Sequence, residues 1–284
     1  MANTNQNINL RKLKQKRKSG KSKPNQNKKT ENKSFYFFIN RTLFFPKQGI
    51  LVIGDLHLGY EAMLIKSGLL TPKMQNKKVI SDLKSTFKEI KKKGYKLKKI
   101  VFLGDIKHAF AYEAEEKFSF REVYDFLQEN LDEKDIIFIK GNHDTIDYTF
   151  NDKLKNYYIC NAGKTGKDKD EKIAFIHGHE SFPEVFDKKV KTIVMGHIHP
   201  SVLFNDPDTS KKEKYKCFLI GKYKGKEIII LPSFLTISIG QPVNNYDDIY
   251  EDYFSIIPRK KILDFNVHVV GEKEIYDFGK VKKL

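Results

Sequence analysis

The chain has 284 residues and a formal net charge of +17, so it is long enough for a sizeable core and favours acidic partners. Its two cysteines, Cys160 and Cys217, do not form the disulfide framework of a small secreted protein and indicate a reducing compartment. No apolar run reaches the roughly 20 residues of a membrane span. The basic N-terminus is not followed by the apolar segment of a signal peptide. We therefore expect a soluble, cytoplasmic protein.

The first 34 residues differ in composition from the rest of the chain. They contain 11 Lys and Arg residues against Glu31 alone, a net charge of +10. The other 250 residues hold 42 basic and 35 acidic side chains, a net charge of +7. Residues 1–34 have almost nothing to bury, which is typical of a disordered segment. They are either a solubilising tail or an arm that binds nucleic acid, and residues 35–284 are expected to form the folded domain.

Strands and helices alternate in the first half of the predicted domain. A hairpin through Asn40 and Arg41 precedes an apolar strand at residues 50–53, and helices follow at 61–67 and 74–93. A second strand at 100–103, a helix at about 115–131 and a third strand at 136–139 complete this half. The β-α-β-α-β order implies parallel strands joined by crossover helices.

The second half is predicted to consist mostly of strands. A short helix is expected at 147–155, and Lys224 with Gly225 suits the tight turn of a hairpin. Residues 205–214 are polar and Lys-rich, and we expect an inserted loop there. The predicted strands are residues 157–160, 172–176, 193–195, 201–204, 216–223, 226–231, 253–257, 265–270 and 275–278.

Five of the predicted strands end in side chains that can bind a metal ion. Open α/β sheets place ligands at the carboxyl ends of their strands, so these side chains are expected to meet. Of the 8 histidines, only His268 lies away from these strand ends, which argues against a chance origin. The candidate ligands are Asp55, His57, Asp105, Asn142, His177, His197 and His199.

Three oxygen donors and four imidazoles are enough for two cations that share one carboxylate. A mixed oxygen and nitrogen set without thiolate favours Mn²⁺, with Fe or Zn²⁺ as alternatives, over Ca²⁺ or a soft metal. Two cations about 3.5–4 Å apart suit in-line displacement at phosphorus. His143 lies beside Asn142 and is the candidate general acid that protonates the leaving oxygen.

The complete set of motifs resembles the calcineurin-like metallophosphoesterase superfamily, and the likeness runs from about residue 50 to residue 200. It implies an α/β fold, a four-layer α-β-β-α sandwich, here with a mostly β C-terminal half. The matching motifs are Gly54-Asp55-x-His57, Gly104-Asp105, Gly141-Asn142-His143-Asp144, His177-Gly178-His179 and Gly196-His197-x-His199.

The resemblance also implies a role for each candidate residue. Asp105 would bridge the two cations, and His143 would be the acid. His179 would support a ligand or contact substrate, and Asp144 would be a structural partner. One cation would be held by Asp55, His57, Asp105 and His199, and the other by Asp105, Asn142, His177 and His197.

One departure from the superfamily pattern points towards nucleases. Protein phosphatases of this class have an Asp three residues after the bridging Asp, where this chain has His108, as in the SbcD-type DNA repair nucleases. His108 would orient His143 or contact phosphate, although packing at a helix start is an alternative. With residues 231–234 and 240–244, the motifs resemble archaeal ICC-like phosphoesterases and the bacterial PdeM-type ligase-associated repair endonucleases still more closely.

We therefore expect a metal-dependent phosphodiesterase that acts on nucleic acid, as DNA repair nucleases do, through a water activated by two metals. Family resemblance alone suggests a repair helicase or ligase as a partner. One alternative is a phosphatase or phosphodiesterase for nucleotides or other small phosphoesters. Another is a non-catalytic scaffold like the phosphoesterase-fold subunit of retromer, although that subunit has lost histidines that this chain keeps.

Overall fold

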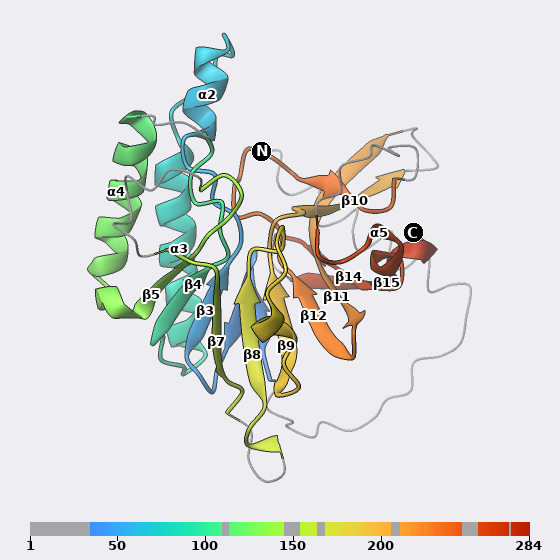
Figure 1. The fold of residues 1–284 in the computed structure, drawn as a ribbon. Helices are drawn as coiled ribbons and strands as arrows, with labels where there is room; N and C mark the ends of the chain where they lie inside the picture. Colours follow the sequence, from blue (N-terminus) through green and yellow to red (C-terminus); the bar gives the residue numbers. More distant parts are fainter. Residues whose placement is uncertain are drawn as a thin grey trace.

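Two β-sheets pack face to face, and helices cover the outer face of one of them (Figure 1). The computed structural model describes residues 35–109, 114–144, 154–163, 168–205, 211–245, 255–272 and 274–284. Among these residues the strands form a six-stranded sheet and a nine-stranded sheet, and the second includes β14 and β15, which pair beside β11. The predicted tail, residues 1–34, lies outside the described residues.

The first sheet contains the predicted parallel strands. β3, β4 and β5 pair in parallel, and β1 and β2 form an antiparallel hairpin that turns at Asn40, whose φ is 51°. Each of β3 and β5 is buried over all four residues, as the continuous apolar runs predict. The strands are β1 (Phe37–Ile39), β2 (Thr42–Phe45), β3 (Ile50–Ile53), β4 (Lys99–Phe102), β5 (Ile136–Ile139) and β6 (Leu154–Lys155).

Helices connect these strands and pack on the outer face of the first sheet. In α3, Val79, Leu83 and Ile90 recur at helical spacing and are buried in the core between helices and sheet. The helix ends in Lys91 and Lys92, where cations face the negative end of the helix dipole. None of the described helices has the length and apolar composition needed to cross a membrane. The helices are α2 (Tyr60–Lys66), α3 (Gln75–Lys92) and α4 (Ala114–Gln128).

The second sheet accounts for most of the C-terminal half. β8, β9 and β12 are parallel, and β11 and β12 are joined by the predicted hairpin turn, in which Lys224 and Gly225 have φ of 47° and 76°. The strands are β7 (Tyr157–Asn161), β8 (Lys172–Ile176), β9 (Val190–Met195), β10 (Pro200–Asn205), β11 (Lys212–Tyr223), β12 (Lys226–Ile230), β13 (Gln241–Pro242), β14 (Asn266–Val270) and β15 (Ile275–Lys280).

Three hydrophobic clusters hold the layers together. One lies between helices and first sheet, one between the two sheets, and one on the outer face of the second sheet. Among the described residues, short segments cover this last face: η3 (Pro183–Phe186), α5 (Arg259–Ile262) and η4 (Val281–Lys283). The α/β class, with two sheets and a strand-rich C-terminal half, is confirmed, and short segments supply the fourth layer.

Three sequence predictions are wrong in part. Residues 154 and 155 form a strand beside β5 instead of the end of a helix, while residues 147–153 lie outside the described part. Residues 212–214 belong to β11, so the predicted loop at 205–214 is shorter than expected. Residues 255–257 are not a strand, although Ile257 is fully buried. In each case the local pattern was ambiguous and pairing or packing with a distant segment decided the structure.

Candidate metal centre

The seven candidate ligands meet at the carboxyl ends of strands from both sheets. Parallel strands end at the same edge, so loops that are far apart in sequence converge there. The first sheet supplies four of the ligands, Asp55, His57, Asp105 and Asn142, which follow β3, β4 and β5. The second sheet supplies His177 after β8, and His197 and His199 after β9.

Four of these residues form a first cluster. Donor atoms of Asp55, His57, Asp105 and His199 lie within 4.8 Å of one another. The two imidazole nitrogens His57 Nε2 and His199 Nε2 are 3.1 Å apart, and His199 Nε2 is 3.2 Å from Asp55 Oδ1. His57 Nε2 lies 3.6 Å from Asp105 Oδ2. This is the set that the resemblance assigns to one cation.

A second cluster shares Asp105 with the first. Donor atoms of Asp105, His177 and His197 also lie within 4.8 Å of one another. His177 Nε2 is 3.0 Å from Asn142 Oδ1, 3.1 Å from His197 Nδ1 and 3.5 Å from Asp105 Oδ1. One oxygen of Asp105 therefore faces each cluster, which is the arrangement that a bridging carboxylate requires.

The donor chemistry of the second cluster fits a cation. His177 Nδ1 donates a hydrogen bond to the carbonyl of Leu103 at 2.7 Å, so the neutral ring has its lone pair on Nε2. That lone pair faces the acceptor oxygens of Asn142 and Asp105. Acceptors that point at one another repel unless a proton or a cation lies between them. The residues present therefore fit a divalent ion bound by oxygen and nitrogen.

Burial and neighbouring charges shift the ionisation of these ligands. Burial, together with the nearby carboxylates of Asp55 and Asp144, raises the pKa of Asp105 to about 9. Burial lowers the pKa of His177 to about 3 and that of His57 well below its usual value. Burial alone would raise the pKa of Asp55, but nearby imidazoles, His199 foremost, hold it below its usual range. The rings of His177 and His57 are thus held in the neutral form that binds metal.

The backbone at the ligands adopts a conformation that non-glycine residues rarely occupy. Among the described residues, six non-glycine residues have positive φ, and four of them are candidate ligands. Such backbone costs about 1–3 kcal/mol per residue and persists where the surrounding structure enforces it. At these residues the positive φ turns the loop sharply and directs the side chain of the ligand into the site. The four are His57, Asp105, His197 and His199, with φ of 45°, 46°, 71° and 42°.

Two glycines of the motifs lie directly against the carboxylates. A Cβ atom on Gly141 would lie 2.2 Å from Asp105 Oδ1, and one on Gly196 would lie 2.5 Å from Asp55 Oδ2. Neither distance is compatible with van der Waals radii. The glycines are therefore needed so that the backbone can approach the ligand oxygens.

His143 and His108 lie beside the first cluster. The ring of His143 is 5.0 Å from that of His57, and its Nδ1 hydrogen-bonds the carbonyl of His108 at 2.6 Å. The two rings, of His108 and His143, stack with centroids 5.4 Å apart, and His108 also contacts Tyr60 edge-on. His108 lies before the start of α4 at Ala114. Burial lowers the pKa of His108 to about 4 and lowers that of His143.

The other two candidates differ in their surroundings. His179 lies next to the second cluster, 5.1 Å from His177 between ring centroids, and its Nδ1 is buried without a hydrogen-bond partner. Asp144 is buried and accepts hydrogen bonds from the backbone N–H groups of Gly141, Ile106 and Lys107. Burial raises the pKa of Asp144 to about 6, although these N–H groups oppose the shift. Asp144 therefore joins the loops after β4 and β5.

Comparison with known proteins identifies the family. Residues 49–222 match the family model described as calcineurin-like phosphoesterase. The chain is a calcineurin-like phosphoesterase. Proteins of this family are hydrolases that use divalent metal ions, and this chain has His and Asp clusters able to bind them.

The comparison with solved structures returned several matches of low sequence identity. The nuclease MPE of Pseudomonas putida has 15% sequence identity and a TM-score of 0.51, with 84% of this chain and 92% of that chain covered. Vps29 of Entamoeba histolytica, complexed with zinc, has 13% identity and a TM-score of 0.34, covering 80% and 96%. A predicted phosphoesterase of Streptococcus pneumoniae has 15% identity and a TM-score of 0.29, covering 81% and 97%. No curated protein sequence matches the chain. The likeness to MPE shows a shared fold.

Sequence reasoning missed Glu116, which holds the His108 loop of this phosphoesterase. Its carboxylate accepts hydrogen bonds from the backbone N–H groups of His108 at 2.9 Å and Ala109 at 2.5 Å. A signal was present in the sequence. Glu116 shares the buried face of α4 with Phe120, Val123 and Leu127, so it is a charged residue on an apolar stripe. A carboxylate in that position needs a buried partner.

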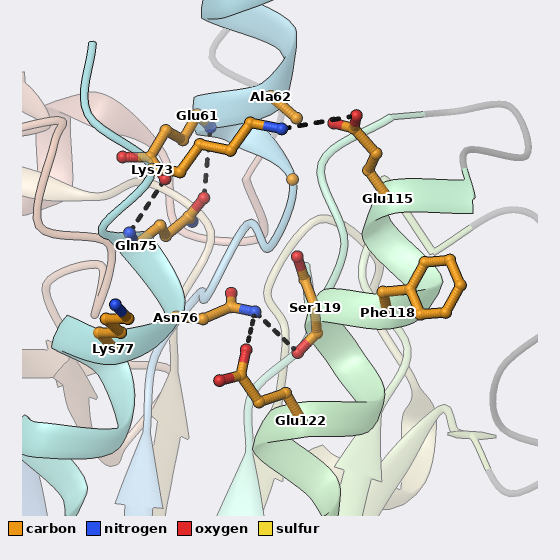
Figure 2. A pocket seen from close by; sticks show the side chains of 11 residues that line it. Glu61, Ala62, Lys73, Gln75, Asn76, Lys77, Glu115, Phe118, Ser119 and Glu122 are labelled. Atoms are coloured by element: carbon orange, nitrogen blue, oxygen red, sulfur yellow. Dashed lines mark hydrogen bonds and ion pairs between the residues drawn. The ribbon is translucent and has the colours of Figure 1, made fainter.

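Gln75 was also missed, and it supports the backbone of His57. Its Nε2 donates to the carbonyls of His57 at 2.8 Å and Leu56 at 3.4 Å, and its Oε1 accepts from the N–H of Glu61. The carboxylate of Glu61 in turn accepts from the N–H groups of Met74 and Gln75. Figure 2 shows the hydrogen bonds between Glu61 and Gln75, which line a pocket of about 280 Å³ between α2, α3 and α4. These hydrogen bonds hold the backbone of the loop that carries His57, a candidate ligand with positive φ.

We expect Gln75→Ala to weaken metal binding, although Gln75 is not itself a candidate ligand. Residues that orient metal ligands contribute roughly 10- to 100-fold in metal affinity, and the substitution leaves the His57 carbonyl without its side-chain donor. Titration of the metal-free protein with Mn²⁺ measures the change.

Asn76→Ala is the matched control for this prediction. Asn76 is the next residue in the same pocket, and its side chain bonds Glu122 and the carbonyl of Ser119 instead of a site loop (Figure 2). It should change stability at most. Equal losses of metal affinity in both variants would contradict the role of Gln75.

Proposed function

We propose that this phosphoesterase hydrolyses phosphodiester bonds in nucleic acid with two divalent cations as cofactors. The observation that carries the proposal is the position of Asp105, whose two oxygens face two separate ligand clusters. Bound cations would lower the pKa of a water molecule and neutralise charge on the phosphoryl oxygens. One cation is assigned to Asp55, His57, Asp105 and His199, and the other to Asp105, Asn142, His177 and His197.

His143 is assigned as the general acid. Its Nδ1–H donates to the His108 carbonyl, which fixes the ring orientation. A protonated ring carries its second proton on Nε2, and that proton can be transferred to the leaving oxygen. His108 and Glu116 hold the loop that positions this ring. His179, with its buried Nδ1, is assigned as a contact to substrate.

Several features support nucleic acid as the substrate. The chain has a net charge of +17, the fold is similar to that of a nuclease, and His108 occupies the position that resembles repair nucleases. The resemblance to ICC-like and PdeM-type enzymes also supports nucleic acid as the substrate. The ligand set favours Mn²⁺, with Fe and Zn²⁺ as alternatives.

One assay separates this proposal from its alternatives. Protein loaded with Mn²⁺, Fe²⁺ or Zn²⁺ is incubated with labelled single- and double-stranded DNA and RNA, and with nitrophenyl phosphodiesters and monoesters. Cleavage of polynucleotide is expected. Hydrolysis of the small diester or the monoester alone would indicate a small-molecule phosphodiesterase or phosphatase. No hydrolysis with any metal would indicate a scaffold.

The basic tail provides a separate prediction about polynucleotide binding. If residues 1–34 contact phosphates, each contact releases counterions and adds roughly 0.9 to the slope of log affinity against log salt for duplex, less for single strands. Engaging four or five phosphates would steepen the slope by about four units. Removing residues 1–34 should therefore weaken binding at low salt and flatten the slope, as measured by fluorescence anisotropy over a salt series.

Hydrolysis of a small diester by the truncated protein is the control, because that substrate reports the metal centre alone. The rate should stay that of the full chain. If affinity and slope for polynucleotide also stay unchanged, the tail is only a solubilising extension.

A further inference from the structure

A hairpin built from β10 and β11 extends from the metal centre. β11 has 12 residues, and residues 217–223 of it pair with β12, β14 or both. Residues 212–216 extend past these strands and pair with β10. We call Pro200–Asn205 with residues 212–216 the β10–β11 hairpin. Figure 1 shows these strands extending beyond the rest of the sheet on the upper right.

The base of the hairpin is fixed to the candidate ligands. β10 begins directly after His199, and the N–H of Gln241 donates to the His199 carbonyl at 2.9 Å. Lys216 Nζ donates to the carbonyls of Ser233 and Leu235. Ser233 Oγ in turn donates to the carbonyl of Asp55 at 3.1 Å. The hairpin therefore has a defined position relative to both clusters.

The outer part of the hairpin is held on its edge as well. The side chain of Asn244 accepts a hydrogen bond from the N–H of Leu203 at 2.9 Å and donates to its carbonyl at 2.8 Å. These are the two hydrogen bonds that a backbone residue of a neighbouring strand would make with Leu203. Asn244 therefore holds the edge of the β10–β11 hairpin in place.

Three lysines follow one face of β11 away from the metal centre. Residues two apart in a strand share a face, so Lys216, Lys214 and Lys212 form a row with steps of about 6.8 Å. Tyr215 and Cys217 point the other way and are buried. The pairing places Lys216 opposite Ser201, Lys214 opposite Leu203 and Lys212 opposite Asn205.

The inner lysine is structural and the outer two are exposed. Lys216 is largely buried, and burial lowers its pKa to about 7. Lys212 and Lys214 are exposed, and Lys214 Nζ lies 3.4 Å from the carbonyl of Gly240, a residue that packs on His199. The exposed cations therefore begin at the rim of the site and continue outward.

Apolar side chains are exposed beside this row. Ile237 and Ile239 are 39% and 45% exposed, and both lie in the segment between Ser233 and Gly240. That segment contacts the carbonyls of Asp55 and His199. Proteins bind single-stranded nucleic acid with cations that follow the backbone and with aromatic side chains on which bases stack. Here two aliphatic side chains supply the apolar surface.

We propose that the β10–β11 hairpin binds a single-stranded polynucleotide on one side of its scissile phosphate, with Lys214 and Lys212 at successive phosphates. This inference rests on the proposed function and names its substrate class. Leu203 and Asn205, which pair with these lysines, lie four and six residues beyond His199, or about 14 and 20 Å along the strand. The two lysines then meet successive phosphates on one side of the cleaved bond, and Ile237 and Ile239 pack against the sugars or bases there.

The test compares the Lys212→Gln/Lys214→Gln protein with the wild type on single-stranded oligonucleotides of two to eight nucleotides. In the wild type, kcat/KM should rise with length until both phosphates are present and then level off. In the variant this rise should be lost. For two contacts, the slope of log affinity against log salt should fall by about 1.4. A fourfold increase in salt then costs the wild type about sevenfold more affinity than the variant.

The matched control also removes two positive charges, but at the start of β9, which is the end of that strand away from the site. Lys188 and Lys189 are exposed and precede β9, whereas the site follows the carboxyl end of that strand. Lys188→Gln/Lys189→Gln should keep the length dependence and salt slope of the wild type. Equal effects in both variants would show a general charge effect and overturn the inference.

The outcomes distinguish failure of the hairpin inference from failure of the proposed function. If the wild type cleaves oligonucleotides and the hairpin variant shows the same length dependence and salt slope, the hairpin inference fails and the proposed function stands. If the wild type hydrolyses a nitrophenyl diester but neither binds nor cleaves any oligonucleotide, both fail. A loss that occurs with duplex and not with single strands would overturn the assignment of a single strand.

Discussion

Asp105→Asn is expected to lose nearly all activity together with bound metal. The asparagine amide has nearly the same shape as the carboxylate but is neutral and has one acceptor oxygen, whereas Asp105 presents one oxygen to each cluster. Two cations at this site would supply several kcal/mol of charge stabilisation, so activity should fall by about 10³-fold. Elemental analysis of the purified protein and the rate on a small diester measure the two losses.

The control for this prediction is Asp264→Asn. Asp264 is exposed, pairs with Lys282 and lies outside both clusters, so the same chemical change should leave metal content and rate as they were. Two metals per chain in an active Asp105→Asn protein would remove Asp105 from the bridging position.

His143→Ala should separate proton transfer from metal binding. A general acid contributes roughly 10²–10⁴-fold to the rate, and His143 is not needed for either ligand set, so the variant should keep its metals. The loss should shrink for a nitrophenyl ester, whose leaving group needs little protonation. The measurement is kcat for two diesters of different leaving-group pKa, with metal content determined on the same samples.

His268→Ala is the reference for removing an imidazole elsewhere. His268 is on β14, packs near Phe38 and lies outside the candidate centre. It should leave both rates and the metal content unchanged. A His143→Ala protein that loses rate equally for good and poor leaving groups would rule out the acid role.

The convergence of the ligands was predictable because it depends on strand direction. Asp55, Asp105 and Asn142 follow strands that had to be parallel, since helical segments separate them in the sequence. Parallel strands bring their carboxyl ends together whatever the loops between them contain. Hydrophobic runs and strand-end polar residues were therefore enough to predict the α/β class and the place where the candidates meet. The roles of individual ligands stay predictions.

Two of the supporting residues, Gln75 and Lys216, were not predictable, because their partners are backbone groups far away in the sequence. Gln75 donates to a carbonyl 18 residues before it, and Lys216 donates to carbonyls 17 and 19 residues after it. A glutamine or a lysine at such positions has no periodic pattern that distinguishes it from a solvated residue. The strand residues 212–214 were read as loop for a related reason. Their polar composition fits a strand with one exposed face, and only the pairing with β10 reveals it.

The division of ligands between the two sheets has a consequence for the order of events in folding. Four candidates follow strands of the first sheet and three follow strands of the second, so each proposed cation is held by both sheets. His197 and His199 are synthesised after every strand of the first sheet, and neither proposed cation can be fully coordinated until the sheets have docked. Once bound, the cations cross-link the two layers. Separation of the sheets then requires release of metal, so a chelator should speed unfolding of the loaded protein, and its lifetime should follow the metal dissociation rate.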